Sequence, residues 1–314
     1  MIHSPEPAHP AQAATLEGTT RLAHLGVIRV EGADAAAFLH GQLTQDFALL
    51  GLSEARLAAF CSAKGRMLAS FVGFKRAPDD ILLVCSRDLL APTLKRLSMF
   101  VLRAKARLSD ASESFQVFGL VGGAVPPQLP PAPWSQWRDG EASAVRLPSA
   151  EGVARALWLV PVGEAAPSGP ALAEPLWRWL AVRSGVATLN QSVVEAFVPQ
   201  MLNYESVGGV NFKKGCYPGQ EVVARSQFRG TLKRRAYVVH AEGTLAPGQD
   251  VFQENDAEQP CGTVVEVAPH PDGGFDAIVS LQTSAAAQGS LHAGNAGGAV
   301  LSLLPLPYPL LDDI

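Results

Sequence analysis

The chain has 314 residues, of which 47% are hydrophobic and 17% are charged, and its formal net charge at pH 7 is -4. This composition supports a globular core and excludes an intrinsically disordered protein. The length is about twice that of a usual domain and therefore predicts two or more subdomains. The slight acidic balance argues against a dedicated duplex-DNA-binding protein, although it leaves room for a local basic groove.

Cysteine usage and the terminal segment indicate the cellular compartment. The cysteines are Cys61, Cys85, Cys216 and Cys261, and they form no CxxC pair and no metal-ligand spacing. A disulfide framework is not expected in such a chain, so we predict a reducing, cytoplasmic setting. The first fifteen residues lack the basic and apolar regions of a secretory signal, and we expect a disordered tail over 1–20. No run of about 18 apolar residues occurs, so no membrane span is predicted.

The first half of the chain predicts one sheet covered by helices. A strand is expected over 25–30, followed by a helix that Asp34 caps and that extends to Phe47. A second amphipathic helix should begin at Asp88, and a strand is expected over 115–121. Between the two helices the pattern predicts a three-stranded meander over 56–61, 67–75 and 81–85.

The next part of the chain repeats these element types. Pro- and Gly-rich connectors occupy 122–133 and 164–170. Strands are expected over 144–147 and 155–160, and a helix over 173–184 that Gly185 ends. The sequence therefore predicts a duplicated α+β unit, although no repeat is visible at the level of residues.

The C-terminal part changes to short strands separated by turns. The five expected strands cover 236–240, 250–252, 263–267, 277–281 and 299–304. Short strands at this spacing are typical of a small β-barrel. The predicted organisation is thus a tail over 1–20, an α+β region over 21–235 whose two subdomains join near 122–140, and a β-barrel over 236–314.

A basic segment over 213–235 stands out in this acidic chain. Its cations are Lys213, Lys214, Arg225, Arg229, Lys233, Arg234 and Arg235. Against the single acid Glu221 they give a local charge of +6 (seven minus one). Such a segment predicts an anion site, since arginine binds carboxylates through two parallel hydrogen bonds. A solvated charged face is the alternative, and an RNA backbone would satisfy the same cations.

Cys216 lies in this segment between Gly215 and Gly219. Tyr217-Pro218-Gly219-Gln220 fits a type II turn, in which proline fixes the second position and glycine supplies a positive φ at the third. The residues over 221–225 favour a helix over an extended strand. A helix N-terminus and the two preceding lysines would favour the thiolate form of Cys216. The alternative is that Cys216 is a small buried hydrophobic residue.

The segment Lys214-Gly215-Cys216-Tyr217-Pro218-Gly219-Gln220-Glu221 resembles the K-G-C-Y-x-G-Q-E signature of the YgfZ family. These folate-binding proteins are related to the glycine-cleavage aminomethyltransferase, or T-protein, and to a mitochondrial factor that matures iron–sulfur proteins. Flanks over 197–203 and 230–234 are also similar, and a weaker resemblance covers about 25–309. The resemblance implies a duplicated folate-binding region followed by a β-barrel. It also implies tetrahydrofolate or a derivative as ligand.

The resemblance implies a function and a set of site residues. The function is support of iron–sulfur enzymes, including those that thiolate tRNA, with those enzymes or their assembly proteins as partners. Cys216 would act as a redox thiol or a transient cluster ligand. A second segment, 38–46, resembles the family's F-L-x-G-Q-x-T-x-D pattern; there Gln42 and Asp46 could face one ligand, unless Asp46 merely caps the helix. The expected cofactor-binding residues are Lys214, Gly215, Tyr217, Gly219, Gln220, Glu221, Arg225, Arg229, Gln42 and Asp46.

Two departures from the T-protein pattern argue against aminomethyl transfer. The positions that match the catalytic aspartate of T-proteins are Ala69 and Ser70, which cannot hold a negative charge or relay a proton. The stretch 181–185 also lacks the pterin-binding glutamate of those proteins. A transferase that uses Asp46 or Glu221 instead is one alternative, and an RNA-interacting accessory protein is another. The seven histidines show no paired spacing, so we expect no metal site.

Overall fold

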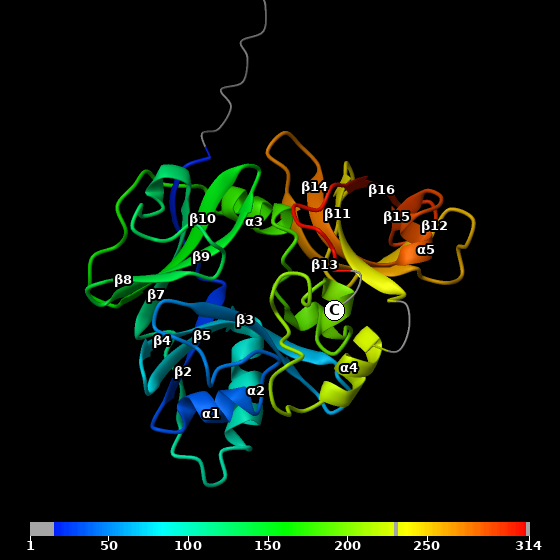
Figure 1. Ribbon diagram of the computed structural model, residues 1–314. Coiled ribbons are helices and arrows are strands. Elements are labelled where there is room, and N and C mark those ends of the chain that lie inside the picture. Colours follow the sequence, from blue (N-terminus) through cyan, green and yellow to red (C-terminus); the bar gives the residue numbers. More distant parts are fainter. Residues whose placement is uncertain (1–15, 229–231, 312–314) are drawn as a thin grey trace, which may run out of the picture.

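The computed structural model describes residues 16–228 and 232–311. They form two antiparallel five-stranded sheets and a closed six-stranded barrel. Figure 1 shows how these three units are arranged. The predicted α+β fold with a C-terminal β-barrel is therefore confirmed. Within the described part of the chain, no helix is both long and apolar enough to cross a membrane.

The first sheet contains the predicted meander. Its strands, in spatial order, are β3 (Ala55–Cys61), β4 (Met67–Ala77), β5 (Asp80–Ser86), β2 (Leu25–Glu31) and β6 (Arg107–Asp110). Helices α1 (Ala35–His40) and α2 (Arg87–Ser98) pack on one face, where Leu39 and Leu97 are fully buried. Helix α1 is shorter than predicted because the chain turns at Gly41, although Leu43 and Phe47 are still buried beneath it. Strand β6 was not predicted, since its polar residues lie at a sheet edge.

The second sheet is built around the strand that follows. Its order is β1 (Gly18–Arg21), β7 (Phe115–Val121), β10 (Val153–Pro161), β9 (Ala142–Ala150) and β8 (Gln136–Asp139). The chain changes sheets between β6 and β7, so the join predicted near 122–140 comes earlier, at 111–114. The predicted tail over 1–20 also ends too late, because β1 pairs with β7. Residues 1–15 of that tail lie outside the described residues.

The barrel closes by pairing its first strand with its last. Its order is β11 (Arg234–Ala241), β14 (Phe275–Gln282), β13 (Gly262–Pro269), β12 (Asp250–Gln253), β15 (Leu291–Ala293) and β16 (Ala299–Leu304). The five predicted strands are present. The sixth strand, β15, is only three residues long and was missed for that reason. The short helix α5 (Thr283–Ala286) follows β14.

Helix α3 (Glu174–Arg183) connects the second sheet with the barrel, and lies between them in Figure 1. On the sheet side, Trp177 packs against β7 at Gly119, where an added Cβ atom would lie 2.6 Å from Trp177 Cδ2. On the barrel side, Trp179 Nε1 donates a hydrogen bond of 2.8 Å to Asp276 Oδ2. The helix therefore holds the two units together through neighbouring tryptophans.

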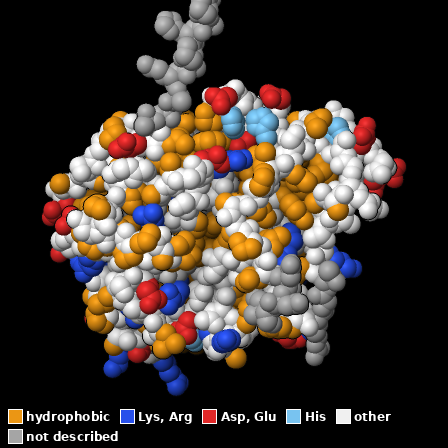
Figure 2. Space-filling model, turned by 45° about the horizontal axis from the view of Figure 1, so that its top comes forward, with side chains coloured by type: hydrophobic (Ala, Val, Ile, Leu, Met, Phe, Trp, Pro, Cys, Tyr) orange, Lys and Arg blue, Asp and Glu red, His pale blue; other side chains and the backbone are white. Residues whose placement is uncertain are grey.

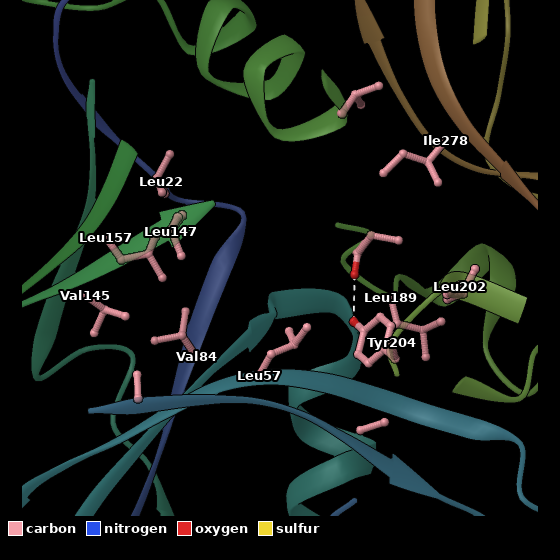
Figure 3. Packing of buried hydrophobic residues seen from close by; sticks show 14 of the residues in the cluster. Leu22, Leu57, Val84, Val145, Leu147, Leu157, Leu189, Leu202, Tyr204 and Ile278 are labelled. Carbon is pink, nitrogen blue, oxygen red and sulfur yellow. Dashed lines mark hydrogen bonds between the residues drawn. The ribbon is translucent and has the colours of Figure 1, made fainter. Parts of the chain in front are cut away.

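The largest hydrophobic cluster extends across all three units. It contains Leu57 from the first sheet, Leu157 from the second and Ile278 from the barrel, and Figure 3 shows these side chains directed toward one another. Tyr204 is fully buried in the same cluster, and its hydroxyl donates to Ala187 O at 2.7 Å. The sheets and the barrel thus share one core. Burial of this shared apolar surface stabilises their placement relative to one another.

The contact at Gly119 makes a stability prediction. The substitution Gly119→Ala should lower the free energy of unfolding by about 1–3 kcal/mol, because the methyl group overlaps the indole of a buried tryptophan. Urea unfolding followed by circular dichroism measures the change. The matched control is Gly51→Ala, where the nearest atom to the new Cβ is Glu54 Oε1 at 3.8 Å. Equal stability of the two variants would contradict the prediction.

Candidate functional site

A cavity of about 580 Å³ lies at the junction of the two sheets, helix α3 and the barrel. Its walls include Leu57 from β3, Leu157 from β10, Trp177 from α3 and Val267 from β13. Figure 3 shows how Leu57, Leu157 and Tyr204 face this region from different units. Figure 2 shows hydrophobic side chains gathered across the middle of one face of the molecule. A largely apolar pocket of this size, with a few polar groups, is typical of a small-molecule site.

Arg155 is the first charged residue in the cavity wall. Its side chain is buried, and its guanidinium lies 4.6 Å from the centre of the Trp177 ring. Nε has no hydrogen-bond partner among the described residues, and Nη1 makes only a long contact of 3.5 Å to Pro148 O. Burial lowers the pKa of Arg155 to about 10, so the group is still charged at neutral pH. The cavity thus contains a cation that the protein does not neutralise by direct pairing.

Glu266 is the second charged residue in the wall, and it comes from barrel strand β13. Its Oε2 accepts a hydrogen bond of 2.9 Å from the Thr188 backbone N–H. Burial raises the pKa of Glu266 to about 7, against the opposing effects of that hydrogen bond and of Arg155. The carboxyl group therefore exchanges a proton near neutral pH.

Neither Arg155 nor Glu266 was identified from the sequence. Each is a single charged residue inside an otherwise apolar strand, in VARALWLV and in TVVEV respectively. A charge that interrupts the hydrophobic pattern of a buried strand is the signal that could have found them.

Some of the positions that depart from the T-protein pattern line the cavity, whereas Ala69 is buried in the core on the helix-covered face of the first sheet. Ser70 faces it from β4, and its Oγ accepts a hydrogen bond of 2.9 Å from Leu189 N. Ala181 and Ser184 face it from the end of α3. The cavity wall therefore has no carboxylate at Ser70 or at the end of α3. Glu266 supplies a carboxylate from another wall.

The Cys216 loop folds locally as predicted. Gly219 has a φ of +80°, and Gln220 N donates to Tyr217 O at 3.2 Å, which is the hydrogen bond of the expected turn. Helix α4 (Gln220–Phe228) follows directly. Gly219 also packs against the β3–β4 turn, where an added Cβ atom would lie 2.7 Å from Gly65 Cα. Cys216 is exposed, so it is not the small buried hydrophobic residue of the alternative interpretation.

Lys214 brings the two recognised segments together. Its ammonium group donates to His40 O and, at 2.7 Å, to Leu43 O. Burial lowers the pKa of Lys214 to about 8. The loop over 214–221 is therefore fixed against the segment over 38–46, and the lysine uses its donors on backbone carbonyls instead of on an external anion.

Asp46 acts within its own segment. Its carboxylate accepts a hydrogen bond of 2.9 Å from Leu49 N and lies 3.0 Å from His40 Nδ1. Although burial raises the pKa of Asp46, these hydrogen bonds outweigh the effect and lower it below its ordinary value. Helix α1 ends at His40, so Asp46 neither caps it nor lies one helical turn from Gln42; its carboxylate closes a local turn at Leu49 instead. Gln42 is nearby, and its buried Oε1 has no partner among the described residues.

The basic segment does not converge on one anion site in the part that the structure describes. Arg225 forms an exposed ion pair with Glu221, and Arg235 forms a buried one with Glu205. Lys233 is exposed. Arg229 lies outside the described residues. The structure weakens the prediction of an anion site in this segment, because Arg225 and Arg235 already pair with carboxylates of the protein.

The predicted cofactor residues and the cavity are separate features. None of the predicted cofactor-binding residues that the structure describes lines the cavity. These residues are Gln42, Asp46, Lys214, Gly215, Tyr217, Gly219, Gln220, Glu221 and Arg225. Cys216 does not line the cavity either, because Lys214 holds its loop against the 38–46 segment instead. A folate in the central cavity would therefore contact other residues.

The barrel brings two of the scattered histidines together. Ligand atoms of His240, His270 and Asp276 lie within 4.8 Å of one another. Asp276 Oδ1 lies 2.8 Å from His240 Nδ1, while its Oδ2 accepts from Trp179. The hydrogen bond with Asp276 raises the pKa of His240. The carboxylate is thus already satisfied by the protein, and the cluster is a structural contact between α3 and the barrel.

Comparison with known proteins gives relatives over nearly the full length. The chain is 28% identical over 306 residues to the tRNA-modifying protein YgfZ of Edwardsiella ictaluri, which covers 90% of this chain and 89% of the relative. It is 27% identical over 333 residues to the protein of the same name from Yersinia pseudotuberculosis, with 99% of both chains covered. No family model matches the chain.

The fold is that of a solved T-protein. The glycine cleavage system aminomethyltransferase T from Bartonella henselae superimposes with a TM-score of 0.70 and 14% sequence identity. The match covers 95% of this chain and 88% of that protein. At this identity the likeness establishes the shared architecture, including the barrel, and nothing about activity.

The raised pKa of Glu266 makes a prediction about stability and pH. The folded protein holds a proton on Glu266 that the unfolded chain loses above pH 4.5, so this residue lowers stability as the pH rises from 4.5 through 7. The substitution Glu266→Gln should therefore gain about 1–3 kcal/mol relative to the unaltered protein over that interval. Urea unfolding at several pH values measures the difference.

The control for this prediction is Glu258→Gln, because Glu258 is exposed on the barrel. It should follow the unaltered protein at every pH. A pH dependence of Glu266→Gln that matches the control would contradict the prediction.

Proposed function

Because this chain is a relative of the YgfZ proteins and has the T-protein fold, we propose that it binds a reduced folate in its central cavity. We further propose that it supports iron–sulfur enzymes, including those that thiolate tRNA, with Cys216 as a redox thiol or transient cluster ligand. Its partners would be those enzymes or their assembly proteins, and its place would be the cytoplasm. The name of the relatives, tRNA-modifying protein, agrees with this output.

The cavity is the single observation that supports folate binding most directly. Its volume of about 580 Å³ suits a ligand of this size, and its walls are largely apolar. Arg87 and Arg178, both about half-exposed, also line it and could attract the carboxylates of a glutamate tail. Bound tetrahydrofolate would supply a carrier for one-carbon units, whereas the residues described here would bind and orient it.

The absence of an acid at Ser70 supports a binding protein over an aminomethyltransferase. Ser70 cannot ionise at neutral pH, and Asp46 and Glu221 do not line the cavity. Measured transfer of a one-carbon unit to tetrahydrofolate from any donor would favour the transferase instead. Salt-sensitive tRNA binding that depends on Arg225 and Lys233 would favour the RNA-interacting alternative.

The first test blocks the cavity. Ala181→Trp places an indole at the cavity wall, at a position that is already partly exposed, and should weaken tetrahydrofolate binding at least about tenfold. Isothermal titration calorimetry measures the dissociation constant. Ala91→Trp, on the exposed side of α2, is the control and should bind as the unaltered protein does. Equal binding by both variants would place the ligand elsewhere.

The second test separates the thiol from the cavity. Cys216→Ser should fail to restore iron–sulfur enzyme activity in cells that lack this protein, while its affinity for tetrahydrofolate stays the same because Cys216 does not line the cavity. Lys213→Ala, an exposed change in the same loop, is the control and should restore activity. Full restoration by Cys216→Ser would show that the thiol is not required.

A further inference from the structure

Arg155 occupies a position that requires an acceptor from outside the protein. Only 2% of the residue is exposed, and its Nε has no partner among the described residues. Its guanidinium carbon lies 4.6 Å from the centre of the Trp177 ring, and this contact uses none of its N–H donors. A buried cation whose one hydrogen bond within the described part of the chain is the long contact to Pro148 O is costly, so a bound group that accepts from it would be favoured.

Glu266 has an oxygen that can accept a hydrogen bond from a donor outside the protein. One oxygen, Oε2, accepts from Thr188 N, and Oε1 has no donor among the residues that the structure describes. The side chain is partly exposed although the residue belongs to a barrel strand that packs against α3, because it borders the cavity. An N–H group from a ligand would satisfy the remaining oxygen.

Both side chains are placed by irregularities of their strands. The register of β10 against β9 shifts between Val153 and Arg155, and the register of β13 against β14 shifts between Val264 and Glu266. Such bulges re-aim side chains and occur preferentially beside functional sites. The two shifts belong to different units of the fold, yet each directs a charge to the same cavity.

The two charges do not neutralise each other directly. Neither residue forms an ion pair with the other among the described residues: the contacts that they make are with Pro148 O and Thr188 N. Both line the same cavity, and each affects the titration of the other, Arg155 lowering the pKa of Glu266 and Glu266 raising that of Arg155. A bound group that has a donor beside an acceptor can therefore contact both from within that cavity.

We propose that Glu266 and Arg155 together read the edge of a ring in which N–H donors lie beside a carbonyl oxygen, Glu266 accepting from the donors and Arg155 donating to the carbonyl. This deepens the folate proposal and rests on it, because the 2-amino-4-oxo edge of a pterin has this arrangement. Guanine carries the same edge. The recognising carboxylate then comes from the barrel instead of from the end of α3.

The test compares pterin with lumazine, which replaces the 2-amino donor by an oxygen and keeps the 4-oxo group. The unaltered full chain should bind pterin at least about tenfold more tightly than lumazine, measured by calorimetry or by quenching of ligand fluorescence. Glu266→Gln should lose that preference, since an amide can face either a donor or an acceptor. Glu258→Gln should keep it.

Arg155 should behave differently from Glu266. Both ligands keep the carbonyl, so Arg155→Met should weaken pterin and lumazine alike and leave their ratio unchanged. Arg155→Lys, which retains the charge but loses the planar fork, serves as the second variant if Arg155→Met does not fold, and should also weaken both. Circular dichroism establishes that each variant is folded.

The outcomes distinguish the inference from the folate proposal. If tetrahydrofolate binds and Glu266→Gln still prefers pterin, the inference is overturned and the folate proposal stands. If guanosine binds in a manner that depends on Glu266 and tetrahydrofolate does not bind, the edge recognition stands and folate is not the ligand. If none of these molecules binds the unaltered protein, both are overturned.

Discussion

The contact of Trp177 with Gly119 is the constraint on which the cavity depends. Because Gly119 has no side chain, the indole lies directly against β7, and the guanidinium of Arg155 lies over the same ring. Two residues later in the helix, Trp179 binds Asp276 of the barrel. Helix α3 therefore fixes the second sheet relative to the barrel, and the space left between them is the cavity. A loss of either tryptophan contact would change the position of both charged residues in its walls.

The molecule separates its two candidate functional features. The cavity is a largely apolar junction whose walls include the buried charge of Arg155 and the carboxyl group of Glu266, whereas the Cys216 loop is an exposed turn fixed by Lys214 to the segment after α1. The lysine satisfies the carbonyl of His40 at the end of helix α1 and that of Leu43 in the segment that follows. The loop is thus rigidly placed while its thiol stays accessible, which suits a group that meets another protein. Ligand binding and thiol chemistry can then be altered independently.

The sequence predicted what local chemistry determines. Alternating and continuous apolar patterns gave most strands of both sheets and five of the barrel strands, and the Pro-Gly pair gave the turn before α4. It could not place the cavity, because Arg155 and Glu266 belong to strands far apart in the chain and meet only when α3 joins the sheet to the barrel. The sequence also overestimated the positive charge that the basic segment offers to an external anion, because the partners of its arginines depend on folding. Arg225 pairs with Glu221, one helical turn away, and Arg235 pairs with Glu205, thirty residues away in the chain.

The placement of the carboxylate has a consequence for how the three units work together. In the cavity wall, β4 contributes Ser70 and the end of α3 contributes Ala181 and Ser184, none of which is an acid. Glu266 brings the only carboxylate that we assign to ring recognition, and it belongs to the barrel. A ligand held between Arg155 of the sheet and Glu266 of the barrel, as we propose, would stabilise the interface between those units as it binds. Occupation of the cavity and docking of the barrel would then be thermodynamically linked, each favouring the other by the same free energy.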